Sequence, residues 1–371
     1  MHVDFLVVGG GISGLAVAAE IVADGSTLVI EAEPMPGMHS TGRSAALFTP
    51  NFGPPLVRAL SSASKATLLK PDGDDASVSF LRQRGLLSVS GSAAGSITEQ
   101  AAFGSSDLNP IHPVSVKQAL DMAPLLRPER INAAWYEPGV MDIDVNALLQ
   151  YCLKRLRASG GKLVCDSPML HCERDGNLWR VNAGELCITA RTIINAAGAW
   201  ASQVASLAGA QSVDLIPKRR TAIVVDGPAS SFSNTMPAVD IVDTGAYFKP
   251  EANRIMASLG DEVPVTAHDV QAEELDVAKI VDCLETETLI SVRTAPTAWA
   301  GLRTFARDNC PVVGFDPITP DFFWLAGQGG YGIMMALSLA RASRGLIVND
   351  AVPEDLFAVG ITADAVAPGR F

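Results

Sequence analysis

The stretch that decides the fold lies near the start of the chain, where residues 5–31 read FLVVGGGISGLAVAAEIVADGSTLVIE. An apolar strand runs into the triplet Gly9-x-Gly11-x-x-Gly14, a helix of small residues follows, and a second apolar strand ends in Glu31. Glycines at this spacing allow a tight turn, close approach of the backbone to a pyrophosphate, and close packing of helix on strand. The helix start binds phosphates, and an acidic residue about 20 positions further on accepts hydrogen bonds from a ribose diol. The segment therefore predicts a Rossmann-like unit for an adenine dinucleotide, and its carboxylate disfavours NADP.

The same stretch is apolar enough to suggest a buried helix, a membrane span or a secretory signal. Three consecutive glycines are unfavourable in a long helix, and no basic region precedes the stretch. We therefore expect a cytoplasmic protein without an integral membrane segment.

Composition restricts the other classes of function. The 371 residues are 48% hydrophobic and 18% charged, which suffices for two domains with substantial cores. Lys and Arg number 28 against 40 for Asp and Glu, and the net charge of −12 argues against a nucleic-acid partner. The six cysteines form no CxxC pair and the five histidines no cluster, so we expect reduced thiols and no metal site.

Further along the chain, hydrophobic periodicity predicts alternating helices and strands. Helices are predicted over Val57 to Leu69, Val145 to Ala158 (capped by Asp144), Asp276 to Thr286 and Ile333 to Leu346. Strands are predicted over Val78 to Ser90, Asn132 to Pro138, Lys162 to Cys165, Leu178 to Asn182, Cys187 to Ala190, Thr192 to Gly198, Thr221 to Val225, Tyr247 to Pro250, Arg254 to Leu259 and Asp321 to Ala326. A second glycine turn, Gly327 to Gly332, precedes the last helix and suggests one long cofactor held at two ends. An NAD-dependent dehydrogenase remains the alternative on the first motif alone.

Several segments resemble the D-amino-acid oxidase/glycine oxidase (DAO) group of FAD-dependent oxidoreductases, most closely the bacterial FAD-dependent D-arginine dehydrogenases. The matching segments are VVGGGISG, HSTGRSAA (His39 to Ala46), Lys218 to Arg220, Tyr247 to Pro250, WAGLR (Trp299 to Arg303), Gln328 to Gly332 and Pro368 to Phe371. The resemblance implies an α/β (α+β) fold with a Rossmann-like FAD-binding domain built from three segments, 1–75, 140–212 and 300–371. An inserted β-rich substrate domain, 76–139 and 213–299, would cover the flavin.

The resemblance also implies how FAD is held. Contacts are expected from Gly9, Gly11, Ile12, Ser13, Gly14, Glu31, Ala32, Ser40, Thr41, Gly42, Arg43, Ser44, Ala45, Met169, Ala197, Gly198, Trp200, Gly301, Arg303, Gly329, Gly330, Tyr331, Gly332 and Ile333. The FAD is expected to be non-covalent, because the nearest thiol to the WAGLR segment, Cys310, is out of place for attachment.

The catalytic residues implied by the resemblance are Arg220, Arg303, Tyr247 and Ser44. A planar guanidinium binds a carboxylate bidentately, so the two arginines would clamp the carboxylate of the substrate. Tyr247 would assist the clamp, and Ser44 would lie close to flavin N5. The alternatives are a structural Arg303, a packing role for Tyr247 and a turn role for Ser44, while Arg219 is expected to be a surface or structural residue.

The side-chain pocket departs from the resemblance. The expected pocket residues are Leu47, Phe48, Phe52, Gly330 and Tyr331. Leu47 and Phe52 replace a histidine and a tyrosine of the D-arginine enzymes, and a glycine near Gly85 replaces a glutamate. Because a buried cation needs a carboxylate partner, we predict a preference for apolar or small side chains, which maximal activity on D-arginine or D-lysine would contradict.

These expectations combine into one reaction. The Cα–N bond of an amino acid, D by resemblance, is oxidised by hydride transfer to flavin N5, and the imine hydrolyses to a 2-oxo acid. Electrons pass on to a quinone-type acceptor or O₂. With Leu47 at the histidine position, and with His39 and His112 expected to be structural, water takes the amine proton. Oxidation of a 2-hydroxy acid or of a secondary amine (sarcosine- or opine-like), and a flavin-binding subunit or sensor, are the alternatives.

Overall fold

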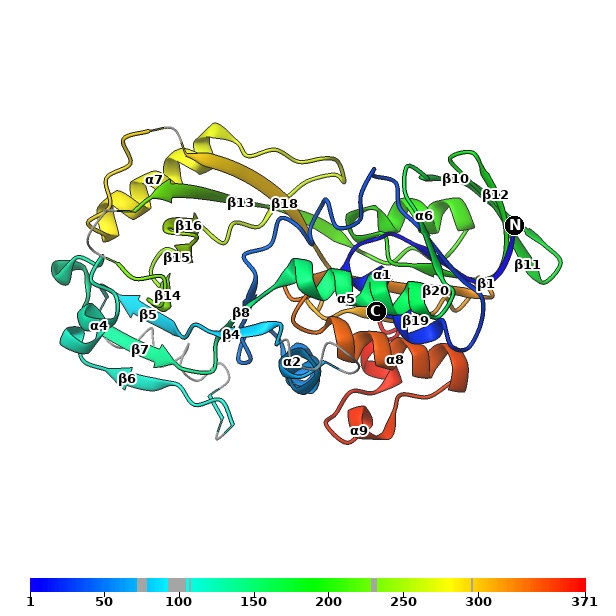
Figure 1. The fold of residues 1–371 in the computed structure, drawn as a ribbon, viewed down its shortest axis with the longest axis horizontal. Helices are drawn as coiled ribbons and strands as arrows, with labels where there is room; N and C mark the ends of the chain where they lie inside the picture. Colours follow the sequence, from blue (N-terminus) through cyan, green and yellow to red (C-terminus); the bar gives the residue numbers. More distant parts are fainter. Residues whose placement is uncertain (72–78, 93–104, 107, 228–231, 295) are drawn as a thin grey trace.

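The computed structural model describes residues 1–71, 79–92, 105–106, 108–227, 232–294 and 296–371. Two halves lie side by side along the long axis of the molecule (Figure 1). One half contains an eight-stranded sheet and both chain termini, and the other contains a ten-stranded sheet. The predicted α/β architecture is confirmed.

The eight-stranded sheet is built on the N-terminal βαβ unit. The spatial order of six of its strands is β10 (Met169–Asp175), β11 (Leu178–Ala183), β12 (Leu186–Asn195), β1 (His2–Val8), β2 (Thr27–Ile30) and β9 (Lys162–Val164), with β20 (Phe322–Ala326) beside β12 and β19 (Val312–Phe315) beside β20. β1 pairs in parallel with both β12 and β2, and β12 pairs in parallel with β20. Parallel strands of this kind need cover on both faces.

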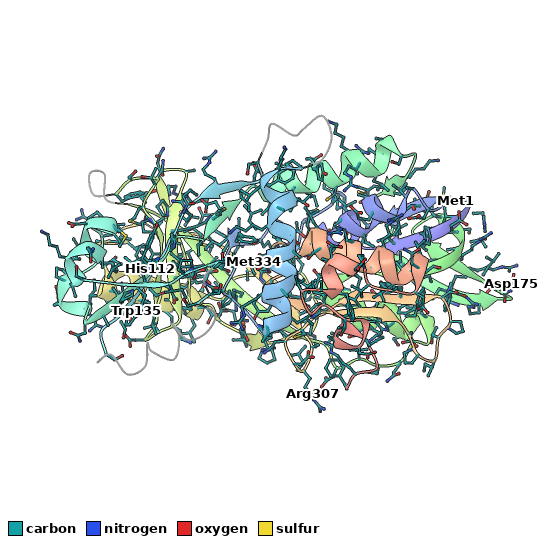
Figure 2. All side chains as sticks on the ribbon, turned by 90° about the horizontal axis from the view of Figure 1, so that it is seen from below. Met1, His112, Trp135, Asp175, Arg307 and Met334 are labelled. Atoms are coloured by element: carbon teal, nitrogen blue, oxygen red, sulfur yellow. The ribbon has the colours of Figure 1, made fainter. Side chains whose placement is uncertain are left out.

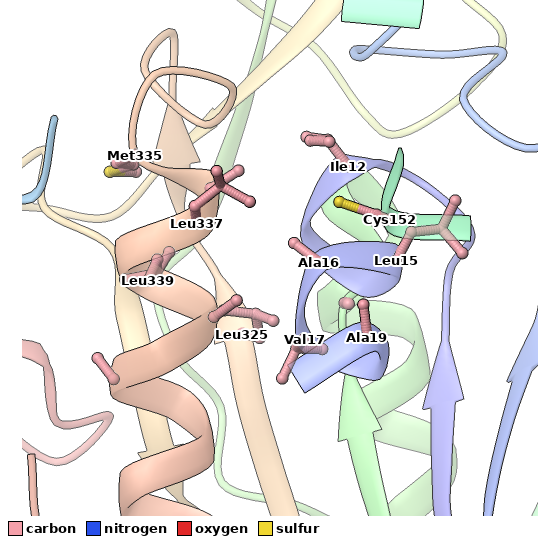
Figure 3. Packing of buried hydrophobic residues seen from close by; sticks show 14 of the residues in the cluster. Ile12, Leu15, Ala16, Val17, Ala19, Cys152, Leu325, Met335, Leu337 and Leu339 are labelled. Carbon is pink, nitrogen blue, oxygen red and sulfur yellow. The ribbon is translucent and has the colours of Figure 1, made fainter. Parts of the chain in front are cut away.

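Both faces of this sheet are covered. On one face, α1 (Ile12–Ile21) packs between α5 (Val145–Ala158) and α8 (Ala336–Asn349), and Figure 3 shows Ala16 and Val17 of α1 turned toward α8. On the other face, α6 (Ala201–Ala208) and the buried ring of Trp324 contribute to a second apolar cluster.

The ten-stranded sheet belongs to the inserted half. Nine of its strands run in the order β21 (Gln328–Gly329), β18 (Thr297–Phe305), β13 (Ile216–Asp226), β16 (Arg254–Ser258), β15 (Ala246–Glu251), β14 (Ala238–Ile241), β5 (Leu86–Ser90), β7 (Ala133–Glu137) and β6 (His112–Val114), and β17 (Val263–Pro264) pairs with β13. We call this sheet the roof sheet. The long strands β13 and β18 run from the inserted half toward the other half (Figure 1).

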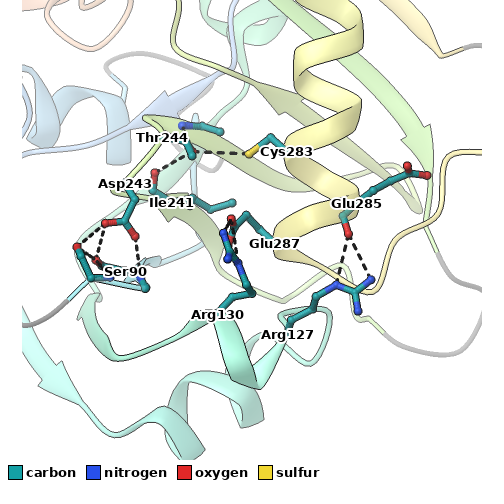
Figure 4. Close-up of polar contacts among 12 residues, drawn as sticks. Ser90, Arg127, Arg130, Ile241, Asp243, Thr244, Cys283, Glu285 and Glu287 are labelled. Atoms are coloured by element: carbon teal, nitrogen blue, oxygen red, sulfur yellow. Dashed lines mark hydrogen bonds and ion pairs between the residues drawn. The ribbon is translucent and has the colours of Figure 1, made fainter.

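Among the described residues, helices cover only one face of the roof sheet. The apolar cluster of α4 (Val116–Met122) and α7 (Glu274–Glu287) contains Leu87, Val239, Phe248 and Ile223 from the sheet. Polar contacts also tie the C-terminal end of α7 to this face, and the Arg130–Glu287 ion pair is drawn in Figure 4. The opposite face of the roof sheet is turned toward the rest of the molecule.

A small sheet and one long helix connect the halves. β8 (Met141–Ile143) lies between β3 (Leu47–Phe48) and β4 (Leu81–Gln83), and α2 (Pro55–Leu69) packs on α8. Figure 2 shows Met334 beside α2 in the middle of the molecule, with Trp135 and Asp175 toward opposite ends. Two short helices, α9 (Glu354–Phe357) and α10 (Ala363–Val366), end the chain.

Most predicted elements exist, with some corrected bounds. The predicted helix at 145–158 and its Asp144 cap are confirmed, since the carboxylate of Asp144 accepts a hydrogen bond from the N–H of Ala147 at 2.8 Å. The strands predicted at 187–190 and from 192 are one strand, β12, because its pairing with β1 continues from Thr189 to Asn195. The helix predicted over Ile333 to Leu346, α8, begins at Ala336 instead of Ile333.

The expected division into domains remains a proposal. The boundary expected at 299/300 falls inside β18, which pairs along its length with β13 of the roof sheet. β18 was not predicted as a strand, nor were β10 and β19. Over the described residues, no helix is both long enough and apolar enough to cross a membrane.

Candidate active site

A cavity of about 530 Å³ lies where the two glycine turns meet the roof sheet. Most of the residues expected to contact FAD line it: Gly9, Gly11, Ile12, Ser13, Glu31, Ala32, Ser40, Thr41, Ser44, Met169, Ala197, Gly198, Trp200, Arg303, Gly329, Gly330, Gly332 and Ile333. These residues come from both ends and the middle of the chain. The cavity therefore collects the N-terminal triplet, the HSTGRSAA loop and the C-terminal glycine turn into one site.

The nucleotide end of the cavity is built by close backbone packing. Gly9 has φ +112°, and a side chain there would meet the carbonyl of Ala196. A side chain at Gly14 would collide with the carbonyl oxygen of Gly9. Gly11 lines the cavity, so a side chain there would project beside Thr41 into the space a pyrophosphate needs. This bare backbone at a helix start fits the adenine-dinucleotide part of FAD.

Glu31 stands at the end of β2 and lines the cavity. One of its carboxylate oxygens accepts a hydrogen bond from the N–H of Gly10 at 2.6 Å and the other from the N–H of Glu33 at 3.0 Å. These bonds hold the carboxylate at the edge of the cavity, where an acceptor for a ribose diol is needed.

The two glycine turns touch each other. The hydroxyl of Ser13 in the first turn donates to Oε1 of Gln328 in the second at 2.7 Å. The two turns are therefore neighbours along the cavity, and the expectation that they hold two ends of one cofactor stays a prediction. Gln328 was missed by sequence reasoning, which attended only to the glycines around it.

Several expected cofactor residues do not line the cavity. They are Gly14, Gly42, Arg43, Ala45, Gly301 and Tyr331. Gly14 is needed for packing, and the guanidinium of Arg43 donates to the carbonyls of Val270 and Ala300 and pairs with Asp269 at 2.6 Å. Gly301 leaves room for Arg303, since a side chain there would lie 2.9 Å from the Nη1 atom of that arginine. The contributions of these residues are therefore indirect.

His39 has structural partners. Nε2 of His39 lies 2.8 Å from Glu33, and its ring centroid is 4.5 Å from that of Trp200. Asp269, from a segment between β17 and α7, lines the cavity beside His39. No sequence motif marks this segment as part of the cofactor site. His112 is exposed on β6.

Arg303 is the central cation of the site. It lies on β18, is 9% exposed and lines the cavity. Its guanidinium donates to the carbonyls of Leu302 at 3.2 Å and Arg43 at 2.8 Å, and no carboxylate of the described residues forms an ion pair with it. Burial, together with the nearby charge of Arg220, lowers the pKa of Arg303 to about 10. A buried guanidinium in this state is stabilised by an incoming anion.

Arg220 lies on β13, which is separated from β21 by β18. Its side chain lies on the same face of the roof sheet as that of Arg303. Its Nε and Nη2 atoms bind the carbonyls of Asp261 and Gly260 and the carboxylate of Glu262. Its remaining nitrogen, Nη1, lies beside Gly330, because a side chain built on that glycine would come within 3.4 Å of it. Arg220 thus reaches the second glycine turn, and its charge acts on Arg303.

Arg219 points the other way. Alternate residues of a strand face opposite sides of a sheet, and Arg219 reaches α7, where it pairs with Asp276 at 2.8 Å and with Glu273. Its side chain is only 7% exposed. Of the two expected roles, surface or structural, the structural one is therefore correct.

Tyr247 and Ser44 complete the candidate catalytic set. Tyr247 is half-buried on β15 and lies near enough to Arg303 to oppose the fall in the pKa of that arginine. Ser44 lines the cavity, and its hydroxyl also accepts a hydrogen bond from the N–H of Ala46 at 3.0 Å. Ser44 therefore has both a turn contact and access to the cofactor space.

The expected side-chain pocket needs one correction. Phe48 is fully buried in the core with α1 and α8, because it and Leu47 are consecutive residues of β3 and face opposite sides. Leu47 is half-buried and lies opposite Asp142 in the small sheet. Asp142 in turn forms an ion pair with Lys249 of the roof sheet. Phe48 is therefore a core residue, and Leu47 keeps its proposed place.

The other two pocket positions, Phe52 and Gly85, each lie beside a tyrosine. Phe52 is 51% exposed, and its ring centroid lies 5.3 Å from that of the buried Tyr331. At Gly85, where the resemblance has a glutamate nearby, a side chain would meet the hydroxyl of Tyr136 at 2.5 Å. The space of that side chain is thus filled by Tyr136.

Comparisons with known proteins agree with this geometry. The family model described as "DAO: FAD dependent oxidoreductase" matches residues 4–344. Human mitochondrial dimethylglycine dehydrogenase is 24% identical over 263 residues, which are 64% of this chain and 29% of that protein. FAD-dependent oxidoreductase domain-containing protein 1 of Xenopus laevis is 29% identical over 180 residues, 42% of this chain and 34% of that protein. The chain spans about a third of the length of these curated relatives.

Solved structures share the fold over the whole chain. Glycine oxidase from Geobacillus kaustophilus superposes with a TM-score of 0.82 at 18% identity, covering 100% of this chain and 99% of that one. L-proline dehydrogenase from P. horikoshii gives 0.80 at 21% identity, covering 99% and 97%. Because the family model covers nearly all of the sequence and the cavity has the cradle that FAD requires, the chain belongs to the DAO family of FAD-dependent oxidoreductases.

Proposed function

We propose that this protein oxidises the Cα–N bond of an amino acid, the D-enantiomer by resemblance, to an imine that hydrolyses to a 2-oxo acid. FAD supplies the hydride acceptor, with a quinone-type compound or O₂ as the final electron acceptor. The observation that carries the proposal is the buried guanidinium of Arg303, which lines the cofactor cavity near the charge of Arg220 and, among the described residues, has carbonyl partners only. An anionic group on the substrate is the natural partner for this pair of cations.

The residues of the chain would orient and desolvate the substrate. Arg303 and Arg220 would hold the substrate carboxylate in one plane, and the phenol hydroxyl of Tyr247 would donate a hydrogen bond to it from the roof sheet. Fixing the carboxylate fixes Cα, and positioning of this kind makes the reaction effectively unimolecular. Gly330, beside Nη1 of Arg220, leaves room for the amine. Water removes the amine proton, since His39 is engaged by Glu33 and His112 lies on β6, at the end of the roof sheet opposite β18.

The substrate side chain would begin against apolar surface. Leu47 and Phe52 stand on this side of the proposed pocket, and Tyr331 supports Phe52 through a ring contact. Small or apolar groups next to Cα are therefore preferred. Ser44 would contact the reactive end of the flavin.

A second candidate is oxidation of an N-alkylated amino acid. It is favoured by the names of two similar proteins, dimethylglycine dehydrogenase and an iminodiacetate oxidase. Both names denote amines that carry a carboxylate, so the same arginine clamp would serve. The products distinguish the two reactions, because a primary amine yields ammonia and an N-alkylated one yields an amine or an amino acid.

The clamp can be tested with Arg303→Ala in the FAD-loaded enzyme. Anaerobic flavin bleaching by a panel of D- and L-amino acids, N-alkyl amino acids and 2-hydroxy acids would first identify substrates. We expect Arg303→Ala to lower kcat/KM by about 10²- to 10³-fold, since removing one partner of a buried charged contact costs about 2–5 kcal/mol. The variant should keep its yellow colour. Arg254→Ala, which removes an exposed arginine paired with Asp226 on the same sheet, is the matched control. Loss of flavin from Arg303→Ala alone would assign that arginine to cofactor binding and contradict the clamp.

A further inference from the structure

A short segment of the inserted half forms part of the wall of the FAD cavity. Residues 266–271 lie between β17 and α7, and we call them the strap. The chain on either side of the strap is fixed to the roof sheet, because β17 pairs with β13 and Glu273 forms an ion pair with Arg219 of β13. The middle residues of the strap, His268 and Asp269, instead line the cavity. The strap therefore reaches from the roof sheet to the cofactor site.

One arginine of the HSTGRSAA loop holds the strap. The guanidinium of Arg43 forms an ion pair with Asp269 at 2.6 Å and donates a hydrogen bond to the carbonyl of Val270 at 3.1 Å. The guanidinium is itself fixed by donation to the carbonyl of Ala300 on β18 at 3.1 Å. Within the described parts of the chain, no other hydrogen bond joins the strap to another segment, and Nδ1 of His39 lies 3.9 Å from the carboxylate of Asp269. The polar attachment of the strap to the cofactor site therefore depends on Arg43.

The apolar attachment of the strap is small. Val270 is buried in a minor apolar cluster with Ala199, Ala300 and Leu302. Because two of these four buried residues are alanines, the cluster buries little apolar surface and contributes little stability. Segments with few buried apolar contacts open at a lower free-energy cost than the core does. Loss of the contacts with Arg43 would therefore free the strap without unfolding either sheet.

Arg43 also balances charge in the cavity wall. The carboxylates of Glu31, Glu33 and Asp269 line the cavity, and the pyrophosphate of FAD brings further negative charge to it. The ion pair with Arg43 neutralises Asp269, which lowers the repulsion between the strap and the cofactor. The sequence motif of Arg43 predicts a contact with FAD, yet Arg43 does not line the cavity. Its contacts with the strap give it an indirect role in holding the cofactor.

We propose that the strap closes one wall of the cavity over bound FAD and that the ion pair of Arg43 with Asp269 latches it, so that this latch sets the rate at which FAD is released. With the latch closed, His268 and Asp269 stay in the cavity wall. With the latch broken, the strap moves away and the bound cofactor can leave. Arg43 and Asp269 are then positioning residues for FAD. Because the substrate plays no part in this step, the proposal is independent of which donor the enzyme oxidises.

The test measures the rate of FAD release from the FAD-loaded protein, as flavin that passes an ultrafiltration membrane at set times after dilution. Asp269→Asn removes the charge of the latch but keeps an acceptor oxygen, so we expect release about 3-fold faster, as for a partly exposed ion pair. Arg43→Ala removes both attachments and should speed release by about 10-fold. The double variant should release FAD no faster than Arg43→Ala, because the ion pair is already broken there. Asp226→Asn alters a 74% exposed carboxylate that pairs with Arg254 outside the cavity, and it should leave the rate unchanged.

Three results would contradict the latch. Release from Asp269→Asn at the wild-type rate refutes it, whether or not Arg43→Ala folds. A double variant in which the two effects multiply refutes it as well, because the two residues would then act separately. Melting temperatures of the FAD-free proteins complete the test. The latch predicts equal values for wild type and Asp269→Asn, and a lower value for the variant would assign the ion pair to the stability of the fold instead.

Discussion

The two large sheets differ in how their faces are used. The eight-stranded sheet is covered on both faces, by α1, α5 and α8 on one and by α6 on the other, so it meets the cofactor only at the ends of its strands. The roof sheet is covered on one face, and its other face presents charged and polar side chains. In the proposed function, the first sheet would therefore contact its ligand mainly through backbone and a short loop, whereas the second would contact it through side chains spread over several strands.

The largest effect is expected from a substitution that disrupts the first glycine turn, at the end of the eight-stranded sheet. Gly14→Val would drive a branched side chain against the carbonyl of Gly9 and separate α1 from β1. We expect protein without flavin and without activity, measured as the ratio of absorbance at the flavin band to that of the protein. Gly369→Val is the control, because the space around that glycine is open. A yellow Gly14→Val enzyme would show that close packing at this turn is dispensable.

The next prediction compares the two faces of the roof sheet through Arg219 and Arg220, which are neighbours on β13 and lie on opposite faces. Arg220→Ala should lower kcat/KM by about 10²-fold or more with little change in melting temperature, because it removes part of the clamp. Arg219→Ala should do the reverse, with kcat/KM nearly unchanged and a loss of about 3–5 kcal/mol of stability, since it leaves Asp276 buried without its partner. Equal effects of the two variants on kcat/KM would contradict the assignment of one face to structure and the other to substrate.

This difference also explains what sequence could predict. The dinucleotide turn can be predicted because its glycines, helix and acidic strand end are consecutive in the sequence, and Gly9, Gly11 and Glu31 line the cavity. The assignment of Phe48 to the pocket failed because strand β3 is two residues long, too short to show which residue faces inward. Asp269 was missed for a different reason: no motif marks the segment between β17 and α7, and only the fold brings it beside His39 at the cavity.

A smaller effect concerns the titration of the roof sheet. Glu137 of β7 accepts a hydrogen bond from Asn51 at 3.0 Å, and burial raises its pKa to about 7 from an ordinary value of 4.5. The folded state therefore holds this proton up to about pH 7, while the unfolded state releases it near 4.5, so the stability contributed by the protonated group is lost as pH rises through that window. Relative to Glu137→Gln, wild type should lose about 3 kcal/mol between pH 4.5 and pH 8.

Melting temperatures of the FAD-loaded proteins across this range would measure the difference. Glu129→Gln, at a 66% exposed carboxylate, should show no such pH dependence relative to wild type. Parallel curves for wild type and Glu137→Gln would mean that the roof face around Glu137 is as wet as an ordinary surface.

The smallest effect concerns a side chain of the eight-stranded sheet that would contact FAD. Because that sheet would bind the cofactor mainly through its backbone, we expect the side chain to contribute little to FAD affinity. Glu31→Gln keeps one acceptor oxygen for the N–H of Gly10 but loses the second oxygen and the charge that would face a ribose diol. We expect FAD affinity to fall about 10-fold, the equivalent of one hydrogen bond to a charged group, with kcat unchanged at saturating FAD. Glu33→Gln is the matched control, because this neighbouring carboxylate also lines the cavity but is engaged by His39. If both variants weakened FAD equally, the effect would come from the general negative charge of the cavity edge, and the acidic end of β2 would have no specific role in holding the nucleotide.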